Sequence, residues 1–320
     1  MQKARKGTIM KSASIHGTLF ASFLVAVFFL TVSSSEAKVL KLTCSPTKGL
    51  NASITKLKPG DTLQVSGNCT ENVVVPEQIN RIIIDGVDKA TRSITPSDPD
   101  GTTMTIRGRD VTVRNLTVNG GQTGIAVRGG GTAVIENNTI QGASGSGLVV
   151  NQQAFARIIN NTIQNNGNNG VAITENSNAR VGFLTNNDTA ALPNTITGNN
   201  RGIVVSESSS AVIVGNNISN NALEGVLVNT VSHADVASNT IDGNGNHGVQ
   251  VGRNSGVDLG ADTGTSIFES PNSTTPGSEN VGFGLRCFIN SYADRRLGTL
   301  NGTSGAKDAF TGGCIDSTIP

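Results

Sequence analysis

The chain has 320 residues, with 24 lysines and arginines against 23 aspartates and glutamates, no tryptophan and one tyrosine. Its 39 glycines and 35 asparagines weaken helices and favour turns, so a helical or doubly wound α/β fold is not expected. The near-neutral charge, without a run of like charges, argues against a protein that holds nucleic acid through its phosphates. We therefore predict no nucleic-acid partner.

The first 37 residues are expected to be a secretory signal peptide. Basic residues precede an uncharged stretch at 19–32, and the small residues Ser35 and Ala37 occupy positions that a signal peptidase reads. This stretch is too short to span a bilayer, so we predict cleavage after Ala37 and no membrane span afterwards. The mature protein is then periplasmic or secreted.

Residues 38–60 are predicted to form an N-terminal cap. The segment 50–57 is the best short amphipathic helix outside the signal, and Lys58-Pro59-Gly60-Asp61 ends it with turn chemistry. A solenoid needs such a cap because its end coils expose unpaired strand edges.

All four cysteines lie in the exported part, where disulfides are plausible. Three pairings are possible, and nearness in sequence favours Cys44 with Cys69 and Cys287 with Cys314. In the loop-entropy model each bond contributes about 3 kcal/mol of stability. Free buried thiols are the alternative.

The middle of the chain repeats itself. A glycine followed by a branched aliphatic residue recurs at spacings of 23, 23, 32, 23 and 23 residues, at Gly124, Gly147, Gly170, Gly202, Gly225 and Gly248. A second marker, asparagine two places before isoleucine, runs in step at Asn138, Asn161, Asn194, Asn216 and Asn239. The one long interval predicts an inserted loop around 183–193.

Within each unit the pattern has period two, which predicts strands. Units of 22 to 23 residues are too short for two strands and a crossover helix, so parallel strands require a coil of short strands and turns. We predict an all-β fold, a right-handed parallel β-helix over 61–260, with coils about 4.8 Å apart. Equivalent residues then stack, giving a buried isoleucine column and a hydrogen-bonded asparagine ladder. Residues 261–320 lose the period and are predicted to be an irregular C-terminal cap.

The repeat at 161–171 is similar to that of the pectin-lyase-like right-handed β-helix superfamily, in particular its bacterial secreted β-helix repeat proteins, and 59–65 with 67–71 resembles its first coil. The resemblance covers Cys44 to Leu259. It implies a carbohydrate substrate or ligand, because members include polysaccharide lyases, polygalacturonases, pectin esterases and uronan epimerases. The chain lacks the Asp-Asp pair of polygalacturonases, the Asp-Pro-His-Asp motif of alginate epimerases and the tryptophan motifs of pectate lyases and pectin esterases.

The residues directly before the last three repeated glycines are polar, namely Arg201, Glu224 and His247. If the coils stack in register, the arginine can neutralise a uronate and the histidine or glutamate can take its C5 proton, as in a lyase or C5-epimerase. We name the trio as candidate catalytic residues and Gln250 and Arg253 as candidate substrate-binding residues. The alternative, which we prefer, is an ion-pair ladder between coils.

Arginines on the coils favour an acidic, uronate-containing polysaccharide as partner. The predicted function is binding or processing of such a polymer, and the alternatives are a non-catalytic carbohydrate-binding module, an adhesin or an envelope structural module. No metal site and no cofactor are predicted, and the oligomeric state is left open.

Overall fold

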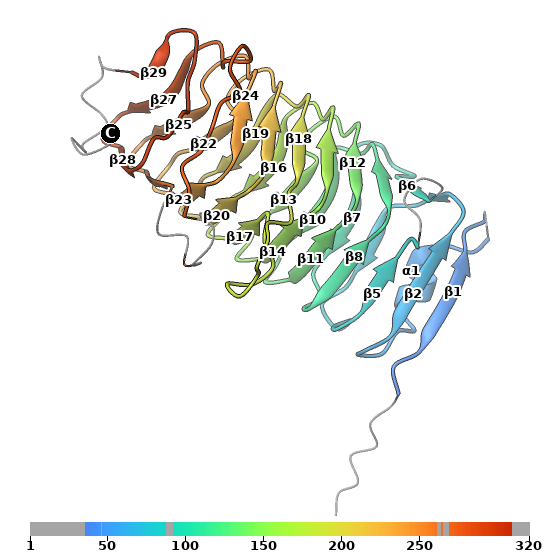
Figure 1. Ribbon diagram of the computed structural model, residues 1–320. Helices are drawn as coiled ribbons and strands as arrows, with labels where there is room; N and C mark the ends of the chain where they lie inside the picture. The colour runs from blue at the N-terminus through green and yellow to red at the C-terminus, as the bar shows by residue number, and fades with distance from the viewer. Residues whose placement is uncertain (1–35, 46, 88–91, 261–263, 265–268, 309–320) are drawn as a thin grey trace, which may run out of the picture. The chain divides into compact units, whose positions relative to one another are not determined.

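The structure is a computed structural model that describes residues 36–45, 47–87, 92–260, 264 and 269–308. In this part of the chain the strands form three sheets, and the strands within each sheet are parallel. Along each sheet the strands follow one another in chain order (Figure 1). Sheet A has 11 strands: β1 (Val39–Thr43), β2 (Thr62–Ser66), β5 (Ile83–Asp85), β8 (Val111–Arg114), β11 (Thr132–Glu136), β14 (Phe155–Ile159), β17 (Asn178–Val181), β20 (Ser210–Val214), β23 (His233–Ala237), β26 (Gly256–Leu259) and β28 (Tyr292–Arg295).

The other two sheets complete each coil. Sheet B has 10 strands: β4 (Val73–Val75), β7 (Thr102–Ile106), β10 (Thr123–Val127), β13 (Leu148–Val150), β16 (Asn169–Ile173), β19 (Arg201–Val205), β22 (Val226–Val228), β25 (Val249–Gly252), β27 (Phe283–Phe288) and β29 (Gly305–Lys307). Sheet C has 8 strands: β3 (Cys69–Thr70), β6 (Ser93–Thr95), β9 (Thr117–Asn119), β12 (Thr139–Gln141), β15 (Thr162–Gln164), β18 (Thr195–Thr197), β21 (Asn217–Ser219) and β24 (Thr240–Asp242). The predicted parallel β-helix is therefore confirmed.

The period-two pattern places apolar side chains in columns inside the coils. In sheet C one column of paired, fully buried side chains contains Ile140, Ile163, Ile196, Ile218 and Ile241. The isoleucine column predicted from the repeat is thus present in the expected register. Burying a side chain of this size stabilises the fold by about 1.5–3 kcal/mol relative to exposure.

A buried asparagine ladder runs along the corner between sheets A and C. In each step Nδ2 of one asparagine donates to Oδ1 of the asparagine one coil further on, over distances of 2.8–3.1 Å. The same oxygen accepts the backbone N–H of the preceding asparagine, and Nδ2 also donates to a strand carbonyl, as Asn194 does to Ile158. The predicted ladder is confirmed and continues to Asn272.

Two further ladders were not predicted. A second asparagine ladder joins Asn166, Asn199, Asn221, Asn244 and Asn280 at the corner between sheets C and B. At the third corner a serine hydroxyl accepts a backbone N–H from the preceding coil, at Ser177, Ser209, Ser232 and Ser255. Each corner therefore satisfies its buried backbone groups with side chains of the next coil.

The sharp corner before the first ladder requires a left-handed residue. Asn137 and Asn160 have φ values of 51° and 56° there, and Gly215 has 70°. Asparagine and glycine tolerate this conformation better than other residues do, which explains why they recur at this point of the repeat.

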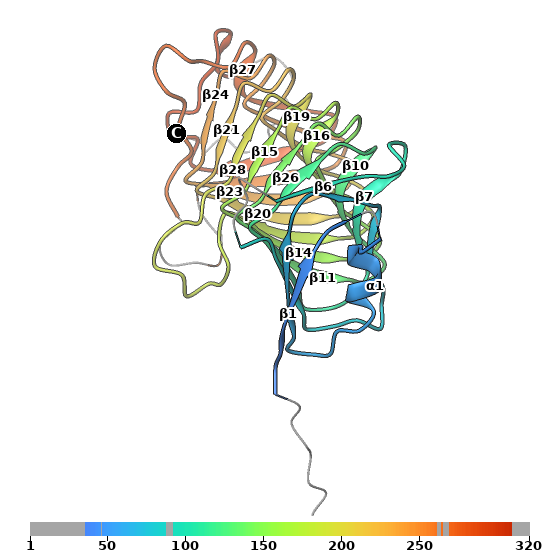
Figure 2. The same ribbon diagram turned by 90° about the vertical axis from the view of Figure 1, so that its right-hand side faces the viewer.

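The first coil is covered by the predicted helix, α1 (Leu50–Ile54), which lies at the β1 end of the stack (Figure 2). Leu50 and Ile54 are fully buried, and the Glu71 carboxylate accepts the first N–H groups of the helix, with Leu50 N at 2.6 Å. The predicted disulfide between Cys44 and Cys69 is present. The described residues contain no helix with the length and apolar character that a membrane crossing requires.

The predicted insertion is also found. After β17 the chain leaves the coil at Gly182 and returns at Leu192, whose N–H donates to the Gly182 carbonyl. Figure 2 shows this loop projecting beside sheet A. Phe183 is fully buried against Val214, so the loop is anchored on the outside of the sheet.

The C-terminal segment differs from the irregular cap expected after 260. Strands β27 and β29 extend sheet B and β28 extends sheet A, all parallel and in register. The coil continues because Asn272 and Asn280 prolong both asparagine ladders, while connections of altered length hide the period in the sequence. Cys287 is disulfide-bonded, and Cys314 lies outside the described residues, as does most of the predicted signal peptide.

We predict that Asn194→Ala lowers the stability of the solenoid by on the order of 3 kcal/mol, because the Ile158 carbonyl and the Asn161 N–H lose their buried partner. Guanidinium denaturation followed by circular dichroism measures the change in midpoint. Asn187→Ala, in the exposed inserted loop, is the control and should leave the midpoint unchanged. Equal midpoints for the two variants would contradict a stabilising role for the ladder.

Candidate functional site

The structure places Arg201, Glu224 and His247 on consecutive coils at one border of sheet B. The N–H of Gly202 donates to the Glu224 carbonyl, and that of Gly225 to the His247 carbonyl, so the three residues stack as the repeat predicts. Arg201 begins β19, and the other two lie just before β22 and β25.

Glu224 has no free carboxylate oxygen in this arrangement. Its Oε2 lies 2.7 Å from Nε of Arg201, and its Oε1 accepts a hydrogen bond from Nδ2 of Asn246 at 2.8 Å. The residue is 4% exposed. A general base needs an accessible lone pair within reach of the substrate proton, and here each oxygen accepts a protein hydrogen bond within an almost fully buried side chain.

His247 is 4% exposed as well. Its Nδ1 accepts the backbone N–H of Phe283 at 2.9 Å, and its ring stacks on the Phe283 ring with centroids 5.9 Å apart. Its Nε2 lies 3.2 Å from a guanidinium nitrogen of Arg286, which is also a donor. Burial lowers the pKa of His247, and the Arg286 charge lowers it further, against the opposing charges of Glu224 and Asp308. These contacts favour a neutral histidine that joins neighbouring strands.

The two predicted substrate-binding residues lie apart from each other. Gln250 is half-buried on β25, paired with Leu227 on one side and with Arg286 on the other. Arg253 is exposed in the turn after β25, with a φ of 53°. The structure therefore brings Gln250, but not Arg253, to the outer face of sheet B.

A pocket with a volume of about 400 Å³ lies at the other end of the same face. Two arginines, Arg107 and Arg128, line it together with uncharged and acidic residues, namely Val74, Pro76, Glu77, Gln78 and Thr105. The arginines follow β7 and β10, which are paired in register, so the two guanidinium groups come from neighbouring coils.

Arg128 is held in place within this pocket. One terminal nitrogen donates to Oγ1 of Thr102 at 3.0 Å, while its buried Nε has no hydrogen-bond partner among the described residues. Burial lowers the pKa of Arg128, and the positive charge of Arg107 lowers it further, against the opposing charge of Glu175. A half-buried cation beside a like charge is a site that favours an anion.

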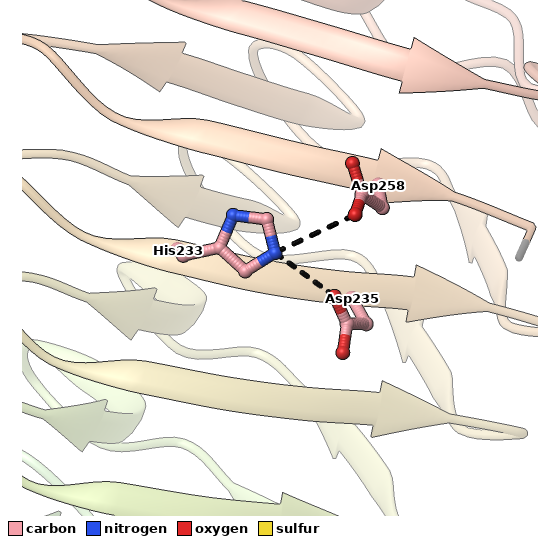
Figure 3. Close-up of side chains that lie close together, drawn as sticks. All are labelled: His233, Asp235 and Asp258. Carbon is pink, nitrogen blue, oxygen red and sulfur yellow. Dashed lines mark hydrogen bonds and ion pairs between the residues drawn. The ribbon is translucent and has the colours of Figure 1, made fainter. Parts of the chain in front are cut away.

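A second cluster lies on the outer face of sheet A. His233 and Asp235 of β23 meet Asp258 of β26, with Nε2 of the histidine 2.9 Å from Asp235 and 3.7 Å from Asp258 (Figure 3). The Tyr292 hydroxyl lies 3.2 Å from Nδ1 of the same ring. The hydrogen bond that the His233 ring donates to Asp235 is the largest influence raising the pKa of His233, although burial opposes it.

This cluster borders a shallow groove of about 230 Å³ that crosses several coils. The groove is lined by residues of β14, β17, β20 and β23, among them Phe155, Asn178, Arg180 and Ser210. Beside the groove the inserted loop is hydrogen-bonded to sheet A, because Arg157 of β14 and Arg180 of β17 both donate to the Leu184 carbonyl.

Neither the arginine pocket nor the histidine cluster was predicted as a site. Both carry a signal in the repeat, because Arg107 and Arg128 are 21 residues apart and Asp235 and Asp258 are 23 apart, one coil in each case. Aligning every outward position of the repeat would have placed these pairs side by side.

Two family models match parts of the chain. One, described as right handed beta helix region, matches residues 183–269, and the other, described as periplasmic copper-binding protein (NosD), matches residues 54–188. The chain is a right-handed parallel β-helix protein. This agrees with the predicted fold class. No curated protein matches the β-helix chain.

Solved structures share the fold of the β-helix. Pectate lyase Pel9A has a TM-score of 0.53 at 13% identity, over 88% of this chain and 82% of its own. The A-module of mannuronan C-5 epimerase AlgE6 from Azotobacter vinelandii scores 0.47 at 15% identity, over 77% and 81%. An alginate lyase from Paenibacillus sp. str. FPU-7 scores 0.40 at 12% identity, over 85% and 99%. At these identities the likeness concerns the fold alone.

The part of the β-helix that matches the copper-binding family does not supply copper ligands. Residues 54–188 contain no histidine, Cys69 is in a disulfide, and Met104 is fully buried. Copper sites in proteins use thiolate, thioether or imidazole ligands, so the donors in this segment do not fit the metal.

We predict that the pKa of His247 lies below its usual value of about 6.5 and rises when Arg286 is replaced by glutamine, because the neighbouring cation is removed while Asp308 and Glu224 remain. NMR titration of the imidazole signals measures both values. Because the native pKa is lowered, stability from this histidine is present above about pH 6.5 and is lost as the pH falls toward the native pKa.

Lys307→Gln is the control for this titration, since it removes one positive charge from the adjacent strand β29. It should leave the His247 pKa nearly unchanged. A pKa above 6.5 in the wild-type protein would contradict the buried, neutral assignment.

Proposed function

We propose that this β-helix protein is exported and binds an extended acidic polysaccharide along the outer face of sheet B. The observation that carries the proposal is the pocket that Arg107 and Arg128 line together. The buried Nε of Arg128 has no hydrogen-bond partner among the residues that the structure describes. Export is supported by the N-terminal sequence pattern and by the periplasmic description of one matching family.

An acidic sugar suits this pocket better than a neutral one. A carboxylate between the two guanidinium groups would relieve their mutual repulsion and accept paired hydrogen bonds from a planar fork of donors. Gln78 and Thr105 offer hydrogen-bonding groups for ring hydroxyls, and Val74 and Pro76 offer apolar surface for a ring face.

The ligand is proposed to be a polymer because the face continues beyond the pocket. From Thr105 the same outward position passes through Ala126, Val149, Ala172 and Val204 to Leu227, Gln250 and Arg286, one residue per coil. Thr105, Val149, Gln250 and Arg286 of this column are half-buried, whereas Ala126, Ala172, Val204 and Leu227 are buried. Coils repeat about every 4.8 Å, so a chain of sugars lying along the face would meet accessible side chains at some of the coils. The same fold carries a pectate lyase, Pel9A, which supports a polysaccharide ligand.

The proposal predicts that the chain after Ala37 binds a uronate polymer and not a neutral glucan. Replacing Arg128 with alanine should weaken binding roughly ten- to hundredfold, the loss expected for one charged hydrogen-bonding partner. Calorimetric titration with oligouronates measures the affinity, and affinity electrophoresis in gels containing each polymer provides a second readout.

Lys41→Ala is the matched control because it removes one exposed positive charge from sheet A and leaves sheet B intact. It should bind like the wild-type protein. Equal losses in both variants would indicate a general charge effect, and equal affinity for neutral and acidic polymers would refute the proposal.

A lyase or C5-epimerase activity at Arg201, Glu224 and His247 stays a prediction. The stacking of the trio on consecutive coils favours it, whereas the burial of Glu224 and His247 disfavours it. Incubation with uronate polymers, followed by ultraviolet absorbance of unsaturated products and by C5 proton exchange, tests the activity. Loss of signal in His247→Ala and Glu224→Ala would support the trio, and equal signals in the wild type and both variants would remove it.

A further inference from the structure

Three carboxylates stack on the outer face of sheet A near its C-terminal end. Asp235, Asp258 and Asp294 are register partners on β23, β26 and β28. Like charges placed directly side by side on neighbouring strands destabilise a sheet unless a positive charge offsets them. Here His233 lies against Asp235 and Asp258, and the Arg295 guanidinium lies 3.8 Å from Asp294. The repeat therefore concentrates negative charge at a place where positive groups gather.

His233 lies at the centre of this group. Its Nε2, an Asp235 oxygen and an Asp258 oxygen lie within 4.8 Å of one another, and Figure 3 shows the ring directed between the two carboxylates. All three side chains are half-buried, so the donor atoms are partly shielded yet reachable from outside.

Tyr292 orients the His233 ring, and Gly256 of the neighbouring strand leaves room for the tyrosine. Tyr292 lies 3.2 Å from Nδ1, and its ring crosses β26 at Gly256. A Cβ on Gly256 would come within 2.0–2.4 Å of that ring, so only glycine allows the tyrosine to reach the histidine. In the structure Nε2 is the donor to Oδ1 of Asp235 at 2.9 Å, because an ionised carboxylate only accepts. A metal ion would replace this proton between Nε2 and the two carboxylates, while the tyrosine oxygen accepts the proton of Nδ1. Metal-binding histidines are commonly fixed through their second nitrogen in this way.

We propose that His233, Asp235 and Asp258 bind a divalent transition-metal ion of the zinc class. One imidazole nitrogen and two carboxylate oxygens are a ligand set that zinc accepts, with bonds of about 2.0–2.2 Å. The three donor atoms lie within 4.8 Å of one another, so small side-chain rotations would bring all three to one ion. Calcium would require six to eight oxygen ligands at about 2.3–2.6 Å, more than these two carboxylates supply.

The ion keeps open coordination positions toward the groove, which His233 and Asp235 also line. Three protein ligands with a remaining open position are typical of zinc sites that bind an external group. The site is independent of the proposed polysaccharide binding, because the arginine pocket lies on sheet B and shares no residue with it.

Calorimetric titration with Zn²⁺ tests the proposal on the chain after Ala37, purified without a histidine tag and stripped with a chelator. We expect one equivalent of Zn²⁺ to bind, a rise in melting temperature on binding, and a loss of affinity of more than about tenfold in His233→Gln and in Asp258→Asn. Co²⁺ should give the visible absorption of a low-coordinate nitrogen and oxygen site.

His247→Gln is the matched control, because it removes the other histidine of the exported chain and leaves the cluster intact. It should keep Zn²⁺ affinity, and circular dichroism verifies that each variant is folded. Folded His233→Gln and Asp258→Asn proteins with unchanged Zn²⁺ affinity would overturn the site. Absence of Zn²⁺ binding to the wild type, or equal affinity for Ca²⁺ and Zn²⁺, would overturn it as well.

Discussion

The stacking of each coil on the next in register is the constraint on which the other features of this β-helix depend. At all three corners a short polar side chain reaches into the neighbouring coil and satisfies its buried backbone. Because a slip of one residue would turn every inward side chain outward, the ladders and the apolar columns determine the same alignment. Two kinds of contact with the same period thereby specify one structure.

Much of this arrangement could be predicted from the sequence, because residues that stack in space recur at a fixed spacing. The isoleucine column and the first asparagine ladder have such a signal, and the inserted loop shows as one break in the spacing. The first disulfide was predicted from the nearness of Cys44 and Cys69 in the sequence. The second ladder was not predicted, although Asn166, Asn199, Asn221 and Asn244 recur at the same spacings as the first ladder. Other asparagines stand beside them in these Asn- and Gly-rich turns, and the sequence does not say which one points inward. The coils after 260 were missed because connections of altered length break the spacing although the ladders continue.

The candidate sites were harder to predict for a related reason. The repeat identifies neighbours, as it did for Arg201, Glu224 and His247, but it does not say how deeply a side chain is buried. Phe283 and Arg286 come from the segment expected to be irregular, and they enclose His247. Conversely, the outward columns hold charged groups that remain accessible, positive on sheet B at Arg107 and Arg128 and negative on sheet A at Asp235 and Asp258.

The inserted loop shows how this architecture tolerates change. Nine extra residues separate Gly170 from Gly202 compared with the usual interval, yet β17 and β20 still pair directly and the asparagine ladder passes the loop without a break. Length added at a corner leaves the strands above and below undisturbed, since each coil contacts only its two neighbours. A loop can therefore be added at one corner without a change in the strands and ladders of the other coils.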